Sequence, residues 1–369
     1  MKITMLQSNI AKVLGQTARI VGTRTTLPVL SNILIQATKG KIRFSATDLE
    51  VGIQTTAIGK IDEEGEITLP ARMLSDFILN NKDESIEIST EATIAKIKSA
   101  HYEATIHGIA AEEFPTIPKP PKSYFAQIKI STFLESLKKV NIAPANDETR
   151  PVLAGIYLQF DGQTLTMAAT DSYRLAERKI TLDAPAEDKK IIVPSRTMNE
   201  VLRILGGSDV ANDISIAISD NQISFKIGDA HIVSRIIEGT FPNYSQIIPS
   251  SSKIKTKVKL TELVSAVKMS FLFAKDSANN NIRLAVKADE LQILSAASQS
   301  GSAKSNIEAK TEGGELEISF NARYFLDVLN VLGEENVLLE FNDATTAGIV
   351  RPEKDDAYLY IIMPLKLDA

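Results

Sequence analysis

The sequence predicts an α+β protein built from three copies of one domain, in each of which two inner helices pack on outer antiparallel sheets. Two observations lead to this prediction. A short apolar strand that runs into an amphipathic helix occurs three times, at 67–78, 190–205 and 318–329. Runs of alternating apolar and polar residues, which are typical of strands, fill the stretches between the helices. The repeat period is about a third of the 369-residue chain, which is the size of a domain.

Each third also opens with a second strand and helix. The strands are expected at 2–6, 127–130 and 255–260, and the helices that follow them at 8–21, 131–140 and 261–273. Because a helix with one apolar stripe and a sheet with one apolar face must pack as layers, we expect the helices on the inside of each domain and the sheets on the outside.

Two proline-containing segments divide the three copies. The segments 114–124 and 241–252 each begin with Phe-Pro and continue in proline and small polar residues, as connectors between domains do. We therefore expect domains at 1–124, 125–252 and 253–369.

The composition argues against an enzyme. The chain has no cysteine and only three histidines, which excludes disulfides, thiol nucleophiles and zinc–thiolate sites and makes a metal site improbable. No glycine-rich phosphate loop, serine–histidine pair or metal-ligand cluster is present, so we predict no catalytic residue, no metal site and no cofactor. A carbohydrate-processing enzyme that uses scattered Asp and Glu is a distant alternative. The N-terminus lacks the apolar core of a signal peptide and no apolar run has membrane length, which predicts a cytoplasmic protein.

The tripeptide Ala-Thr-Asp ends a predicted strand twice, at Asp48 and at Asp171. Two such aspartates could be paired catalytic carboxylates. We interpret them instead as turn residues whose side chains accept hydrogen bonds from local backbone amides.

Six segments, taken in order, identify a family. They are 26–34, 46–50, 69–72, 169–176, 239–244 and 360–367, and with them the chain resembles the β sliding clamp of bacterial DNA polymerase III over essentially its full length. The resemblance implies a non-catalytic processivity factor: a head-to-tail homodimer that forms a ring around duplex DNA and tethers the polymerase catalytic subunit. A clamp loader must open such a ring. The sequence repeat alone would also allow a closed monomer or an open filament.

The resemblance assigns the exposed helix faces to DNA. The net charge of −5 argues weakly against a nucleic-acid partner, but a total says nothing about how charges are distributed. The basic residues expected to contact phosphates without sequence preference are Lys12, Arg19, Arg24, Arg72, Lys138, Lys139, Arg196, Arg203, Lys268 and Arg323. The alternative for Arg72, Arg196 and Arg323 is an intrahelical ion pair with the acid four residues on, and for Lys138 and Lys139 a solvated helix face.

The resemblance also implies a groove between the second and third domains. This groove would bind a short peptide carried by the polymerase and by other replication and repair proteins. Its expected walls are Leu153, Thr170, Ser172, Tyr173, Arg174, Leu175, Pro242, Ile247, Ile361, Met363, Pro364 and Leu365. For the contact between subunits we nominate Leu272 and Phe273 against Ala104 and Ile106. The alternative function is a repeat-built peptide-binding scaffold that does not encircle DNA.

Overall fold

The computed structural model describes residues 1–22, 27–119, 123–147, 149–207, 212–275, 278–298 and 301–366, without the side chains of 278 and 296–298. Contacts divide the chain into two compact units. One unit is Met1–Ile130 with Arg203–Ile236, and the other is Ser131–Leu202 with Ile237–Ala369. Within the described residues, no helix is long and apolar enough to cross a membrane.

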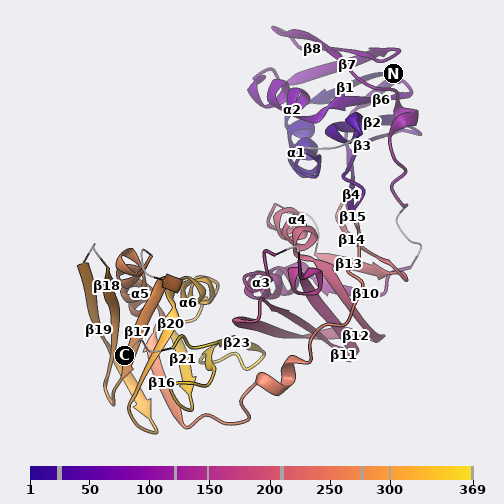
Figure 1. The fold of residues 1–369 in the computed structure, drawn as a ribbon. Coiled ribbons are helices and arrows are strands. Elements are labelled where there is room, and N and C mark those ends of the chain that lie inside the picture. Colours follow the sequence, from indigo (N-terminus) through magenta and orange to yellow (C-terminus); the bar gives the residue numbers. More distant parts are fainter. Residues whose placement is uncertain are drawn as a thin grey trace. The chain divides into compact units, whose positions relative to one another are not determined.

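The first unit contains helices α1 (Gln7–Thr17) and α2 (Ala71–Asn80) and two antiparallel sheets (Figure 1). The five-stranded sheet has the order β5 (Lys60–Glu63), β1 (Lys2–Leu6), β7 (Ser85–Glu91), β8 (Ile94–Lys98), β9 (Glu103–His107). The eight-stranded sheet has the order β10 (Ala126–Lys129), β13 (Asp213–Ile218), β14 (Gln222–Ile227), β15 (Ala230–Arg235), β4 (Val51–Ala57), β3 (Lys41–Thr47), β2 (Asn32–Thr38), β6 (Gly65–Pro70).

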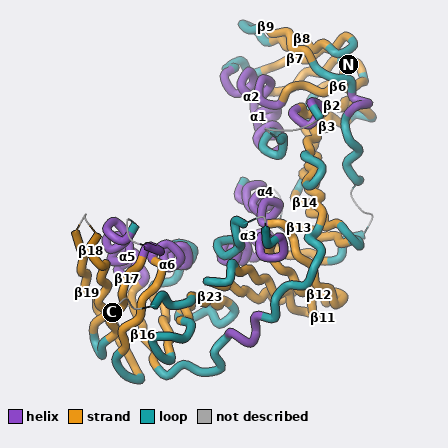
Figure 2. The backbone as a smooth tube through the Cα atoms, viewed as in Figure 1, coloured by secondary structure: helices purple, strands orange, loops and turns teal. Residues whose placement is uncertain are grey.

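The second unit contains most of α3 (Ile130–Val140) and α4 (Ser195–Gly206), together with α5 (Leu260–Ala274) and α6 (Ala322–Leu329). One sheet of ten antiparallel strands runs through it. The order is β11 (Gly155–Thr170), β12 (Arg174–Pro194), β23 (Tyr358–Ile362), β22 (Gly348–Pro352), β21 (Asn336–Phe341), β16 (Ile254–Lys259), β19 (Gly301–Glu312), β18 (Glu290–Ser298), β17 (Asn281–Val286), β20 (Leu316–Asn321). Figure 2 shows the same alternation of strands and short helices by colour.

The predicted α+β class is confirmed, and each helix buries one apolar stripe against the sheets. Helix α1 buries Ile10, Val13 and Leu14, and in α6 the ring of Phe325 stacks on Phe320 of β20 with centroids 6.0 Å apart. The predicted helix over 8–21 is wrong at its end, because α1 stops at Thr17. In the last turn of α1, the carbonyls of Gly15 and Gln16 accept hydrogen bonds from the Arg203 guanidinium.

Two strand pairings carry the sheets across the predicted domain boundaries. Strand β4 pairs with β15, placing Gly52 opposite Val233, and β12 pairs with β23, placing Leu175 opposite Ile361. We call these the first and second junctions. Since backbone hydrogen bonds run continuously through both, the two compact units do not follow the three predicted domains, and the boundaries at 124 and 252 stay a prediction.

His231 lies on β15 at the first junction, opposite Gln54, with only 5% of its surface exposed. Neither ring nitrogen has a hydrogen-bond partner in the described part of the chain. Burial, and to a smaller degree the charge of Lys226, lowers the pKa of His231 from 6.5 to about 4. The folded protein therefore keeps this ring neutral at a pH where the unfolded chain protonates it.

We predict that acidification from pH 6.5 to about 4 destabilises the protein through His231. The unfolded state binds the proton first in this window, so the free energy of unfolding falls, by roughly 3 kcal/mol for this group. His231→Leu, which copies Leu359 at the equivalent place of the second junction, should remove that part of the pH dependence in urea titrations. The exposed His107→Gln serves as the control and should leave it unchanged. An identical pH profile for His231→Leu and the unmodified chain would contradict the prediction.

Candidate functional site

A tight turn leads into β12 and organises the predicted groove. The Asp171 Oδ1 accepts hydrogen bonds from the backbone amides of Tyr173 and Arg174, at 2.9 and 3.0 Å. The Thr170 hydroxyl donates to the Arg174 carbonyl at 2.6 Å, and Ser172 takes the left-handed φ of 82° that the turn requires. Asp48 holds the amides of Glu50 and Val51 in the same way. Both aspartates are thus turn residues, as interpreted from the sequence.

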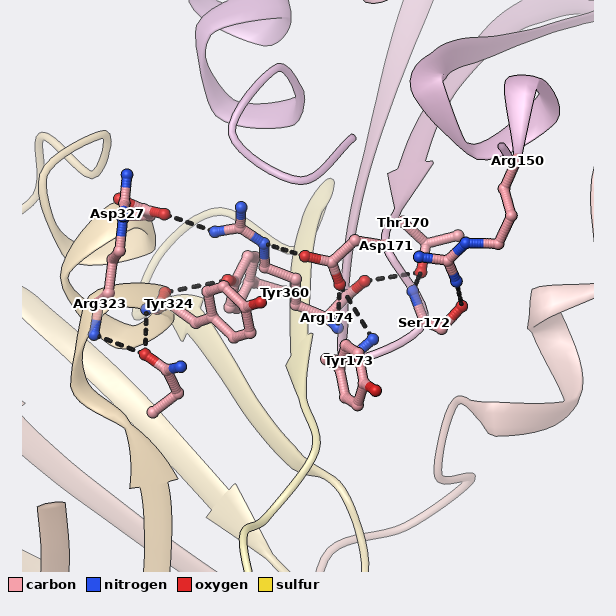
Figure 3. Close-up of polar contacts among 11 residues, drawn as sticks. Arg150, Thr170, Asp171, Ser172, Tyr173, Arg174, Arg323, Tyr324, Asp327 and Tyr360 are labelled. Atoms are coloured by element: carbon pink, nitrogen blue, oxygen red, sulfur yellow. Dashed lines mark hydrogen bonds and ion pairs between the residues drawn. The ribbon is translucent and has the colours of Figure 1, made fainter. Parts of the chain in front are cut away.

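Arg174 connects this turn to α6 (Figure 3). Its Nε donates to Asp171 Oδ2 at 2.9 Å, its Nη1 donates to Asp327 Oδ2 at 2.5 Å, and its guanidinium lies 4.2 Å from the centre of the Tyr324 ring. Only 8% of Arg174 is exposed. The sequence places Arg174 in the wall of the groove. Because its charged atoms are already engaged inside the protein, it holds the groove in shape rather than offering a free charge.

Tyr360 completes this network from β23. Its hydroxyl donates to the backbone carbonyl of Tyr324 at 2.9 Å, which ties the last strand to α6. Burial raises the pKa of Tyr360, so the hydroxyl remains a donor. Asn321 caps α6 by accepting from the amides of Arg323 and Tyr324. Strands β12 and β23 are therefore both tied to α6, β12 through Arg174 and Asp327 and β23 through Tyr360 and Tyr324.

Four of the predicted wall residues lie together beside this network. Leu175 and Ile361 face each other across the second junction and are buried, and the amide of Met363 donates to the Tyr173 carbonyl at 2.9 Å. Tyr173, Ile247 and Met363 are exposed at 60%, 48% and 39%. Of the remaining predicted wall residues, Leu153 and Thr170 are buried, Pro364 and Leu365 are half-buried, and Ser172 and Pro242 are exposed.

Sequence reasoning missed the polar side of the site. A hollow of about 480 Å³ is bordered by Arg150, Tyr173, Asn321 and Tyr324 among others, and the Nη1 of Arg150 donates to the Ser172 hydroxyl at 3.1 Å. Asn321 carried a usable signal, because it stands in the repeat where Pro70 and Pro194 stand in the other two copies. Arg150 had no such signal, since its loop is not part of the repeated motif.

One predicted DNA contact, Lys139, is wrong, while Arg203 stays a prediction. Lys139 is 2% exposed, and its Nζ lies 2.9 Å from Glu135, 3.2 Å from Asp355 and 3.6 Å from Glu334, so it neutralises buried acids instead of facing solvent. Arg203 is half-buried and is hydrogen-bonded to the end of α1.

The other predicted DNA contacts are exposed wherever the structure describes them. Arg24 lies outside the described residues. The remaining side chains are exposed, namely Lys12, Arg19, Arg72, Lys138, Arg196, Lys268 and Arg323. The intrahelical pair of Arg72 with Asp76 exists at 3.8 Å, but both side chains are largely exposed, so it contributes little to stability. Asp327 forms an ion pair with Arg174, whereas the sequence alternative paired it with Arg323.

The nominated subunit contact is partly contradicted. Ile106 is 2% exposed and belongs to the core of the first unit, so its side chain cannot form a contact between subunits. Ala104 is half-buried on β9, Leu272 is 54% exposed on α5, and Phe273 is half-buried. No group of His, Asp and Glu that could hold a metal ion occurs within the described ranges.

The comparisons with known proteins agree along the whole chain. Family models of the DNA polymerase III beta subunit match residues 1–118 as its N-terminal domain, 127–243 as its central domain and 245–366 as its C-terminal domain. The beta sliding clamp of Staphylococcus aureus is 30% identical over 99% of both chains. Among solved structures, the Bacillus subtilis sliding clamp is 28% identical with a TM-score of 0.94, and a Pseudomonas aeruginosa clamp bound to griselimycin is 28% identical with a TM-score of 0.93. Each of these structures is covered completely, as is the present chain.

We predict that Arg174→Leu destabilises the protein by roughly 3 kcal/mol, because it leaves the carboxylates of Asp171 and Asp327 without the cation that they share. Urea unfolding measures the loss. Arg150→Leu is the matched control, since Arg150 pairs with Asp147 near the surface and its loss should cost less than about 1 kcal/mol. Equal losses of stability in the two variants would show that the buried ion pairs of Arg174 stabilise the protein no more than the surface pair of Arg150.

Proposed function

Because the chain belongs to the DNA polymerase III beta subunit family, we propose that it is a sliding clamp, a non-catalytic ring around duplex DNA that tethers the replicative polymerase. The match of all three family domains over the whole chain is the observation that carries this proposal. It acts in replication as an accessory subunit of the polymerase holoenzyme, with domains at 1–124, 125–252 and 253–369, in the cytoplasm.

The ring is closed by two copies in head-to-tail contact. At each junction within the chain, a strand from the first half of one domain, β4 or β12, pairs with the last strand of the next, β15 or β23. The corresponding strands at the ends of the chain are β9 and the part of β19 at 301–308. In the described residues, β9 pairs only with β8, and 301–308 pairs only with β18.

These unlike edges suit a heterologous contact that closes after two copies. Leu272 and Met269, both more than half exposed on α5, lie on the helix beside this part of β19, and Met269 shares a shallow hollow with Ser305 and Ile307. Their apolar surface supports the contact. A closed ring admits DNA only when it is opened, which is the task of the clamp loader.

DNA passes along the exposed cations of the helices. Lys12, Lys138 and Lys268 lie on α1, α3 and α5, which hold the same place in the three copies, and Arg72, Arg196 and Arg323 lie in the first turn of α2, α4 and α6. Contacts to phosphates alone carry no sequence information, which suits a protein that slides. The net charge of −5 is compatible with this, because the acids can lie on other faces.

The groove at the second junction binds a peptide of the polymerase and of other replication and repair proteins. Exposed Tyr173, Ile247 and Met363 provide an apolar rim, and the Arg174 network fixes the turn beneath them. Apolar walls with few polar anchors suit a short linear segment.

We predict retention of the protein on nicked circular DNA and its release when that DNA is linearised, because a closed ring leaves only over a free end. Reversing Arg72, Arg196 and Arg323 to Glu should weaken retention and reduce the salt slope by up to about 3. The matched control reverses three exposed strand lysines, Lys41, Lys96 and Lys226. Equal release from both DNA forms, or a monomer by light scattering, would support the scaffold without DNA encirclement instead.

We predict that griselimycin, the ligand of the Pseudomonas aeruginosa structure, binds this chain at the second junction. Met363→Ala removes apolar surface from the rim and should weaken binding about tenfold, or about 1.4 kcal/mol, in calorimetry. Met73→Ala is the control, because Met73 is a similarly exposed methionine on α2. Unchanged affinity for Met363→Ala would remove the groove from the proposal.

A further inference from the structure

The two junctions are built on one plan. Gly52 stands opposite Val233 at the first junction, where Leu175 stands opposite Ile361 at the second. The pairing begins at the same place in both, since Val51 faces Ser234 and Arg174 faces Ile362. Gly52 is therefore the counterpart of Leu175, and Val233 that of Ile361.

The turns that lead into the junctions are also the same. In both, an aspartate accepts from the amides two and three residues on, and the next residue has a positive φ, 78° for Leu49 and 82° for Ser172. Thr47 and Thr170 each donate a hydroxyl hydrogen bond to the carbonyl four residues on, at 2.9 and 2.6 Å. The backbone beside the proposed peptide groove is thus present twice.

The connectors return over the junctions in parallel. Phe114 packs in a cluster with Val29 and Val233 just before Pro115, and Phe241 packs in a cluster with Ile192 just before Pro242. Three residues after these phenylalanines stand Ile117 and Tyr244. The first connector therefore lies over the first junction, at the place that corresponds to the predicted groove of the second junction.

A hollow of about 280 Å³ lies at this place on the first junction, between β4, β15 and the connector. Its apolar floor is Gly52, Ile117 and Val233. A Cβ on residue 52 would lie 3.0 Å from Ile117 Cγ2 and 3.1 Å from Val233 Cγ1, so a larger residue would require these side chains to shift by a few tenths of an ångström. The floor has Gly52 where the second junction has Leu175, and Ile117 fills part of the space that this leaves. The floor therefore accepts a small aliphatic group.

The rim of the hollow is charged, unlike that of the second junction. Glu50 and Arg235 occupy the places of Tyr173 and Met363. Both are exposed, and they are neighbours, because the Arg235 amide donates to the Glu50 carbonyl at 3.1 Å. Neither side chain takes part in an ion pair within the residues that the structure describes, so both charges are available to a ligand.

We propose that the first junction is a second docking groove, which binds an extended segment of a partner protein with one small aliphatic side chain between an acidic and a basic one. The acidic residue pairs with Arg235, the basic residue pairs with Glu50, and the aliphatic side chain covers Gly52 and Val233. This inference rests on the proposed peptide groove for its pattern but involves different residues and a different ligand chemistry.

The experiment selects peptides from a random heptapeptide display library on the unmodified full chain, with an excess of griselimycin present to occupy the second junction. Enriched peptides are then measured by fluorescence polarisation. We expect both charges to be enriched around a valine or alanine, and affinity to fall at least tenfold on Arg235→Glu and on Glu50→Lys. The double variant Glu50→Arg, Arg235→Glu should restore binding to peptides whose two charges are exchanged.

Thermal unfolding of each surface variant confirms that the fold is kept, and Arg43→Glu, on the neighbouring strand β3, is the control for a simple loss of positive charge. Peptides that bind Arg235→Glu and Glu50→Lys as well as the unmodified chain, or the absence of enrichment, would overturn the second groove. Griselimycin affinity for the unmodified chain, measured alongside, reports on the proposed groove at the second junction separately.

Discussion

Antiparallel strand pairing across the domain boundaries is the interaction on which the rest of this structure depends. Because β4 pairs with β15 and β12 with β23, each domain extends the sheet of the next by backbone hydrogen bonds that do not depend on side chains. The pairing sets side-chain register at both junctions, and register decides which residues share a face. The register at the second junction places Leu175 opposite Ile361 in the predicted groove and sets Arg174 at the start of the pairing with β23.

Side chains make the second junction different from the first. Arg174 and Arg178 lie on one face of β12, at the two ends of the stretch that pairs with β23. Arg174 binds Asp171 and Asp327, while Arg178 binds Asp355, which Lys139 also contacts. Burial would raise the pKa of Asp355, but the hydrogen bond and charge of Arg178 lower it. Buried charges are tolerated here because each has partners, and removing one leaves the others uncompensated. The first junction has Val51 in place of Arg174 and relies on apolar packing and on the Arg203 hydrogen bonds.

This difference bears on function. A peptide groove needs walls that keep their shape when it is empty, and the ionic contacts of Arg174 provide that at the second junction. At the first junction, Gly52 and Ile117 leave a shallower floor with a charged rim. Repeating one domain therefore gives the chain equivalent surfaces whose chemistry can diverge, while the pairing that holds the domains together stays the same.

The sequence by itself determined the domain repeat, the α+β class, the six strand-to-helix units and the turn role of Asp48 and Asp171, because these follow from periodicity, capping and turn chemistry within a few residues. The sequence could not decide which basic side chains are exposed and which are buried against acids or carbonyls. Lys139 follows Lys138 on the same helix, yet only tertiary packing brings Glu334 and Asp355 to it and buries it. For the same reason, the sequence did not show that the Arg203 guanidinium is hydrogen-bonded to carbonyls of α1 or that Ile106 is buried in the core of its own unit. Partners that are distant in sequence set burial and charge pairing, and these are known only once the strands have paired.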